Sequence, residues 1–249
     1  MKTQIVRARD VTKVFDKGAV EVQALRGVNL DVYEGDFLAL VGPSGSGKTT
    51  LLNLIGALDA PTDGELTVLG RAIARLSRSE RAEMRLRSLG FVFQAYNLVP
   101  VLTALENVEF VLELQGAGAE RRGRAMAVLA ELGLADLAHR RPNELSGGQQ
   151  QRVAVARAVA ARPRLVLADE PTANLDGENA EILMHLMREL RSSHGMTFLF
   201  STHDPRVVAH ALRVVTLVDG RVAHDEERSG EAPHEILPRV GKAPGPEGR

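Results

Sequence analysis

A glycine-rich loop that could bind a polyphosphate follows the apolar run Phe37 to Val41. Three glycines occur within positions 42 to 47, then come a lysine, two threonines and a leucine-rich helical run. Glycines let successive backbone N–H groups close around phosphates, and the following helix adds partial positive charge at its N-terminus. We therefore expect Lys48 to reach the β- and γ-phosphates of a nucleotide and Thr49 to bind Mg²⁺. The expected contact residues are Gly42, Pro43, Ser44, Gly45, Ser46, Gly47, Lys48, Thr49 and Thr50.

Two adjacent carboxylates, Asp169 and Glu170, end another apolar run that begins at Leu165. Ligands of α/β sheets bind where strands end, so this position suits a role near the phosphates. Asp169 is suited to Mg²⁺, directly or through water. Glu170 is suited to act as a general base that deprotonates the attacking water. Alone, such a pair is more often a solvated turn or a helix cap, so the assignment depends on the phosphate loop.

The segment Leu145-Ser-Gly-Gly-Gln149 combines a helix cap with two unexpected glycines. Ser146 and Gln149 have the spacing of a capping box. Gly147 and Gly148 would destabilise the first helical turn by about 1 kcal/mol each relative to Ala. Because glycines at a helix N-terminus let an anion approach the backbone closely, we expect a second surface for the nucleotide here.

Together with further motifs in the same order, these segments resemble the nucleotide-binding subunits of ATP-binding-cassette transporters. The further motifs are Gly90-Phe-Val-Phe-Gln94, Ala173-Asn-Leu-Asp176 and the histidine of Ser-Thr-His203-Asp. The resemblance extends over about residues 4 to 226. It departs from the usual pattern at Asn174 and at Ala95, which leaves the ATPase assignment intact and the transported substrate open.

The resemblance implies roles for residues that carry little signal on their own. Gln94 would sense Mg²⁺ and the membrane partner, and His203 would contact the γ-phosphate and the attacking water. Ser146 to Gln149 and Asp176 would contact the nucleotide, and Phe15 would stack on adenine, as a phenyl ring can without a hydroxyl. By residue type alone, His203 and Phe15 are more often core side chains.

The resemblance also implies how the protein works. Two subunits would close around two ATP molecules, each Ser146 segment facing the partner's phosphate loop, and would drive a separate membrane permease. The segment from Gly90 to Pro100 and the run Gln149 to Ala154 look like the subgroup that serves lipoprotein release, macrolide and peptide export, and cell division. The implied location is the cytoplasmic face of the inner membrane, without nucleic acid as a partner.

Two other functions are compatible with a phosphate loop. A cassette ATPase acting on DNA would have a long coiled coil between the halves of its site, whereas Gln94 and Ser146 are 52 positions apart; ribosomal relatives carry two cassettes in one chain. A small-molecule kinase or GTPase does not need Leu145 to Gln149, and the sequence has no Asn-Lys dipeptide for guanine recognition.

Composition is consistent with a folded ATPase. With 31 Lys plus Arg against 32 Asp plus Glu, the chain gives no general reason to bind nucleic acid. It has no cysteine, which excludes disulfides and thiolate metal sites, and fits a reducing compartment. No stretch is apolar enough to span a bilayer, and the N-terminus does not look like a signal peptide.

The elements that position these residues form an α/β fold. Runs apolar at every position, at 37–41, 165–168 and 198–200, predict strands covered on both faces, and helix-length segments lie between them. We expect a P-loop NTPase core of the ABC type with a mixed sheet, and an N-terminal antiparallel β subdomain with strands at 21–25 and 28–32.

We predict a nucleotide-binding domain over residues 4–226, with a helical subdomain inserted at about 95–155, and a Pro/Gly-rich, disordered tail over 227–249. The apolar segment Tyr96 to Leu102 predicts, with Leu105 to Phe110, a groove for a permease helix. The alternative is that Leu98 and its neighbours pack the helical subdomain.

Overall fold

The core of the protein is a six-stranded sheet. A computed structural model describes residues 2–16 and 21–228. In the order β10-β9-β3-β8-β7-β6, every neighbouring pair is parallel except β9 and β10. The three predicted buried strands are therefore confirmed as β3, β8 and β7. The strands are β3 (Phe37–Val41), β6 (Leu89–Val92), β7 (Leu165–Asp169), β8 (Thr197–Ser201), β9 (Arg213–Val218) and β10 (Arg221–Glu227).

A second, antiparallel sheet contains the N-terminal strands, as predicted. Its order is β2 (Glu21–Tyr33), β1 (Gln4–Asp16), β4 (Asp63–Val68) and β5 (Arg71–Ala72). The two short strands expected at 21–25 and 28–32 are a single strand. Its register with β1 shifts between Val28 and Arg26, where Gly27 has a φ of 81°. Gly27 thus permits a β-bulge, which bends the strand without ending it.

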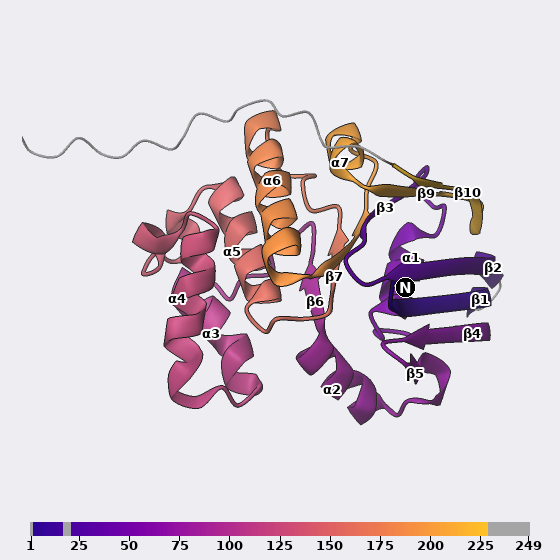
Figure 1. Ribbon diagram of the computed structural model, residues 1–249, viewed down its shortest axis with the longest axis horizontal. Coiled ribbons are helices and arrows are strands. Elements are labelled where there is room, and N and C mark those ends of the chain that lie inside the picture. Colours follow the sequence, from indigo (N-terminus) through magenta and orange to yellow (C-terminus); the bar gives the residue numbers. More distant parts are fainter. Residues whose placement is uncertain (1, 17–20, 229–249) are drawn as a thin grey trace, which may run out of the picture.

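Helices cover the larger sheet (Figure 1). Ser77, Thr103 and Ser146 each begin a helix with a capping box, and Asp176 and Asp204 cap two others. The helices are α1 (Lys48–Ile55), α2 (Arg78–Ser88), α3 (Ala104–Leu114), α4 (Arg121–Glu131), α5 (Gly147–Val159), α6 (Gly177–His194) and α7 (Pro205–His210), with 3₁₀ turns η1 (Ile73–Arg75), η2 (Gly118–Glu120), η3 (Ala135–Leu137) and η4 (Pro142–Glu144).

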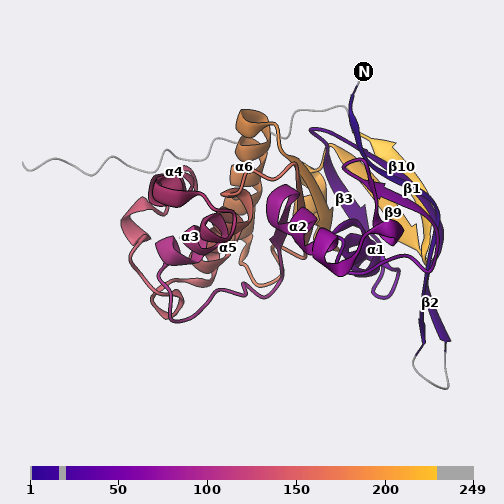
Figure 2. The same cartoon turned by 90° about the horizontal axis from the view of Figure 1, so that it is seen from below.

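The larger sheet separates two hydrophobic cores. Along β8, Phe198 and Phe200 face the core formed with α3 to α6, whereas Leu199 faces the core shared with α1 and the antiparallel sheet. Figure 2 shows the two sheets lying side by side with α1 between them. Burial of both faces explains why these strands carry no polar alternation.

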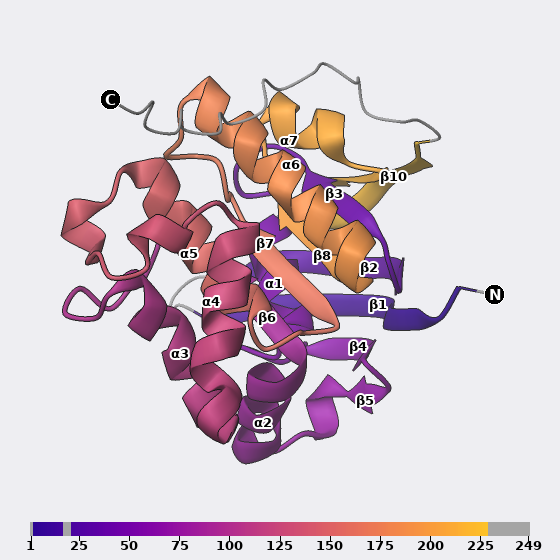
Figure 3. The same cartoon turned by 60° about the vertical axis from the view of Figure 1, so that its left-hand side comes forward.

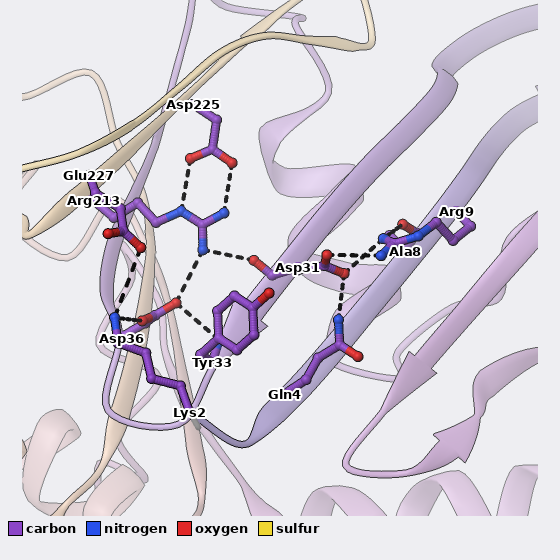
Figure 4. Close-up of polar contacts among 10 residues, drawn as sticks. All are labelled: Lys2, Gln4, Ala8, Arg9, Asp31, Tyr33, Asp36, Arg213, Asp225 and Glu227. Carbon is purple, nitrogen blue, oxygen red and sulfur yellow. Dashed lines mark hydrogen bonds and ion pairs between the residues drawn. The ribbon is translucent and has the colours of Figure 1, made fainter.

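Arg213 joins the C-terminal hairpin to the N-terminal strands. Its guanidinium makes two hydrogen bonds to Asp225, at 2.8 and 2.6 Å, and also bonds the buried Asp36 and the backbone carbonyl of Asp31 (Figure 4). The bonds to Asp225 raise the pKa of Arg213 although burial opposes this. The guanidinium therefore stays charged and holds β9, β10 and β2 together.

Between residues 95 and 155, where the helical insertion was predicted, α3, α4 and most of α5 pack as one group (Figure 3). Strand β10 extends through Glu227, so the boundary predicted for the tail falls inside a strand; residues 229–249 lie outside the described residues. Within 2–16 and 21–228, no helix is long and apolar enough to cross a bilayer.

Candidate functional site

The phosphate loop joins β3 to α1 and packs between the segments that contain Leu217 and Ala24. A Cβ on Gly42, whose φ is 149°, would come within 2.1 Å of the Leu217 carbonyl oxygen. A Cβ on Gly47 would come within 2.7 Å of the Ala24 oxygen, and the N–H of Gly220 donates to the Ser46 carbonyl over 3.1 Å. Only glycine fits at these two positions, so packing fixes the curve of the loop.

Lys48 and Thr49 follow the loop on the first turn of α1. The Lys48 ammonium donates to the carbonyl oxygens of Gly42 and Pro43, at 2.7 and 3.1 Å, and within the described residues no carboxylate pairs with it. The Ser46 hydroxyl is buried and has no protein partner. A cation bonded only to carbonyls and a loop too tight for side chains fit a bound polyphosphate.

The Thr49 hydroxyl donates a 3.2 Å hydrogen bond to Asp169, which places two oxygens together beside the phosphate loop. The described residues contain no cluster of three or more His, Cys, Asp or Glu that could hold a metal alone. One hydroxyl and one carboxylate suit Mg²⁺, which keeps waters and shares phosphate oxygens rather than using an all-protein cage. The residues therefore fit the predicted ion.

Glu170 lies one residue beyond β7 and is held by residues that follow β8. Its carboxylate lies 2.7 Å from His203 Nδ1 and accepts a 3.3 Å hydrogen bond from the buried Thr202 hydroxyl. Its own N–H donates to the Ser201 carbonyl at 2.8 Å, and its φ of 49° is unusual for a non-glycine residue. The roles expected for Glu170 and His203 at the same attacking water imply that the two residues are close, whereas the contact with Thr202 was not predicted.

Gln94 and the segment that contains Asp176 meet through Asn174. The Asn174 side-chain amide donates a 2.9 Å hydrogen bond to the Gln94 carbonyl oxygen. Asp176 caps α6 by accepting from Asn179, and the hydrogen bonds from the backbone and side chain of Asn179 lower the pKa of Asp176. Asn174, a departure from the usual pattern, thus connects two of the predicted motifs.

Ser146 to Gln149 form the predicted capping box at the start of α5. A Cβ on Gly147 would lie 2.9 Å from the Tyr96 hydroxyl, and one on Gly148 would lie 2.4 Å from the Asn179 amide oxygen. Part of the need for glycine is therefore local packing, which the sequence did not indicate. Helix α5 lies among the helices on one side of the molecule and α1 on the other (Figures 1 and 2).

Phe15 lies near the end of β1, opposite Val22, and is 36% exposed. The neighbouring part of β2, Ala24 and Leu25, touches the phosphate loop at Gly47. An exposed ring this near the loop fits the predicted stacking on a base.

The apolar segment after Gln94 differs in part from the predicted permease groove. Leu98 packs against the helical core, and Leu105 and Val108 are buried, in agreement with the alternative that this segment packs the helical subdomain.

Comparison with protein families matches residues 25–173, more than half of the chain, to the family described as ABC transporter. The chain belongs to the ABC transporter family of ATPases. The predicted family, fold class and enzyme class of this ABC ATPase are confirmed, and a small-molecule kinase or a GTPase is excluded.

Individual relatives of this ABC ATPase include transport proteins. The lipoprotein-releasing system ATP-binding protein LolD of Anaeromyxobacter dehalogenans is 49% identical over 238 residues, which cover 92% of this chain and 97% of the relative. The macrolide export ATP-binding/permease protein MacB of Wolinella succinogenes is 44% identical over 228 residues, 91% of this chain and 35% of MacB. This chain thus spans about a third of the length of MacB.

A solved structure is similar to this chain over the same share of its length as MacB. The ATP-binding cassette MJ0796, in a dimeric post-hydrolysis state bound to ADP and Pi, superposes with a TM-score of 0.84 at 44% identity, covering 91% of this chain and 100% of that one. This ABC ATPase therefore shares the fold of a cassette seen with its hydrolysis products.

Proposed function

We propose that two copies of this ATPase close around two ATP molecules and drive a separate membrane permease from its cytoplasmic face. The observation that carries the proposal is the separation, within one chain, of the two surfaces expected to bind the nucleotide. The phosphate loop precedes α1, and the Ser146 segment begins α5 on another side of the molecule. A second copy would supply the missing surface to each site. The dimeric MJ0796 structure supports this arrangement.

Within each proposed site, the chain's own groups divide the work. The loop from Gly42 to Thr50 binds the phosphates, and Lys48 exchanges its two carbonyl partners for phosphate oxygens. Thr49, Asp169 and Gln94 would hold Mg²⁺, and the ion would neutralise charge on the phosphates. The backbone at Ser146 to Gln149 and the side chain of Asp176 act on the nucleotide of the partner subunit.

Glu170 takes the proton of the attacking water, and His203 fixes the orientation of the Glu170 carboxylate. The Thr202 hydroxyl and the His203 ring contact different oxygens of the Glu170 carboxylate, so both limit its rotation. A carboxylate held this way presents a fixed lone pair to a water in line with the γ-phosphorus. The His203 side chain is 75% exposed, so its ring is also accessible to a bound γ-phosphate while Nδ1 contacts Glu170.

We propose that the permease binds at a groove between α2, β6, α3 and α5. The groove encloses about 310 Å³ and is lined by Leu58, Phe91, Phe93 and Val111, with Leu58 47% exposed. An apolar groove of this kind fits the apolar face of a helix. Arg157 also lines it and donates to the carbonyl oxygens of Tyr96 and Asn97, at 3.1 and 2.5 Å. A movement of the groove on permease binding would therefore be transmitted through Arg157 to the segment that follows Gln94.

We further propose lipoprotein release, or export of a drug or peptide, as the transport process. The support is the similarity to LolD over nearly its whole length and to the ATP-binding part of MacB. Purification of the complex from the native membrane would test this, because the permease that is recovered defines the substrate class.

A complementation experiment tests the shared sites. Ser146→Arg should abolish ATPase activity without abolishing ATP binding, because the altered surface acts on the partner's nucleotide. Lys48→Ala should abolish both. A mixture of the two inactive variants forms one site with an intact phosphate loop and an intact Ser146 segment, so part of the activity should return. Full activity of Ser146→Arg alone would refute the shared site.

A further inference from the structure

Lys13 is a largely buried cation next to the ring expected to stack on adenine. Its side chain is 12% exposed, and Nζ lies 2.7 Å from an Asp59 carboxylate oxygen and donates a 2.9 Å hydrogen bond to the Ala60 carbonyl. The same nitrogen lies over the Phe15 ring, 5.1 Å from its centroid. This distance is within the range of a cation–π interaction.

Strand β1 presents Lys13 and Phe15 on the face of the sheet that meets the phosphate loop. The register of β1 with β2 shifts between Lys13 and Val14, but the Lys13 ammonium lies over the Phe15 ring, so the two side chains share a face of the sheet. Leu25 pairs with Lys13 on β2, and its Cδ2 atom would lie 2.8 Å from a Cβ on Gly47. Directly paired residues share a face of the sheet, so the face with Lys13 and Phe15 is the one that meets the loop.

Asp59 fixes the ammonium rather than leaving it mobile. Burial would raise the pKa of Asp59, but the hydrogen bonds from Lys13 and from the Ala60 N–H lower it below its ordinary value. The Asp59 carboxyl is thus charged at neutral pH. The segment after Asp59 also runs beside β1, because the Thr62 N–H donates to the Thr12 carbonyl and the Val14 N–H donates to the Thr62 hydroxyl. The cation is held between two elements that are hydrogen-bonded to each other.

We propose that Lys13, anchored by Asp59, is a positioning residue that orients the Phe15 ring for a purine base. The ammonium covers one face of the ring, and the opposite face receives the base. Without the cation, a ring that is 36% exposed near the end of a strand can turn among its rotamers. Ordering the ring then costs conformational entropy when the nucleotide binds, which weakens binding. The proposal depends on the proposed ATP site and on the expected stacking of Phe15 on adenine.

The test compares a ligand that contains the base with one that lacks it. Binding of ADP and of inorganic pyrophosphate would be measured by calorimetry on the full chain, with Mg²⁺. Lys13→Met keeps the aliphatic stem and removes the charge, and Lys13→Arg keeps the charge. We expect Lys13→Met to weaken ADP binding roughly threefold to tenfold, with pyrophosphate binding unchanged, and Lys13→Arg to retain most of the ADP affinity.

A double-mutant cycle completes the test. In a Phe15→Ala background, Lys13→Met should cause no further loss of ADP affinity. An equal loss for pyrophosphate, or the same loss without the ring, would overturn the proposal, because the charge would then act on the phosphates or on the fold. If Phe15→Ala weakens ADP binding but Lys13→Met does not, only the role of Lys13 fails. If Phe15→Ala binds ADP like the parent, the stacking role fails as well.

Discussion

His203 Nδ1 lies 2.7 Å from Glu170 Oε1, although the two residues are 33 positions apart and leave different strands. Strands β7 and β8 are parallel neighbours in the sheet, with Asp169 paired to Ser201. The residues that follow both strands therefore emerge at one edge. This contact joins the proposed base to the residue expected at the γ-phosphate.

Replacement of Glu170 should separate ATP binding from hydrolysis. Glu170→Gln keeps the shape of the side chain and removes the base, so turnover should fall by on the order of 10²-fold or more while ATP still binds. Gel filtration with ATP should reveal a trapped dimer. Glu178→Gln, a change on the first turn of α6, serves as a control and should hydrolyse ATP normally. Turnover of Glu170→Gln at the parent rate would refute the assigned role.

Removal of Lys48 should abolish ATP binding without unfolding the protein. Within the described part of the chain its ammonium bonds only two carbonyl oxygens of the phosphate loop, so Lys48→Ala takes little from the folded state. Equilibrium binding of labelled ATP and circular dichroism would be measured on the same sample. Retention of ATP affinity would show that the phosphates bind elsewhere.

Gly148 should be sensitive to its neighbour Asn179. In Gly148→Ala the new Cβ would lie 2.4 Å from the Asn179 amide oxygen, so we expect a loss of about 1–3 kcal/mol in the free energy of unfolding. Asn179→Ala should remove the clash with the amide group, leaving the Cβ contact of 3.1 Å, and restore much of this stability in the double variant, as measured by chemical denaturation. A double variant that is stable but inactive would assign the glycine a second role, at the partner's nucleotide. Parent-like stability of Gly148→Ala would contradict the steric argument.

A charge in the proposed permease groove should uncouple the subunit. Leu58→Glu alters a side chain that is 47% exposed, so basal ATPase of the isolated subunit should persist while stimulation by the permease is lost. Val218→Glu, at 41% exposure on β9, is the matched control. Leu98→Glu should instead destabilise the subunit, because Leu98 packs against the helical core. Normal stimulation of Leu58→Glu would place the contact elsewhere.

Stability in acid should depend on Asp204. Burial would raise the pKa of its carboxyl, but hydrogen bonds from Arg206 and Thr172 lower it below the ordinary value of 3.8. A carboxyl with a depressed pKa in the folded state stabilises the protein above pH 3.8, and this contribution is lost as the pH falls through the folded value. Asp204→Asn should lose stability at neutral pH and show a weaker pH dependence below about 4. Denaturation curves from pH 3 to 7 would measure both effects.

Much of this ATPase could be predicted from local sequence. Both faces of the larger sheet are covered, so its central strands need apolar residues at every position. This pattern is visible in the sequence at 37–41, 165–168 and 198–200. The phosphate loop and the capping box at Ser146 were equally visible, since their chemistry is carried by neighbouring residues.

Tertiary structure decided what depends on residues far apart in the chain. No local pattern indicated that Gly148 faces Asn179, that Thr202 binds Glu170, or that Lys13 lies over Phe15 and is held by Asp59. Strand β6 also went unpredicted, because its four residues include Gly90, which is required where a Cβ would lie 2.6 Å from the Ala158 carbonyl oxygen. Such contacts depend on strand order and helix packing, and a side chain's type does not state which distant partner will meet it.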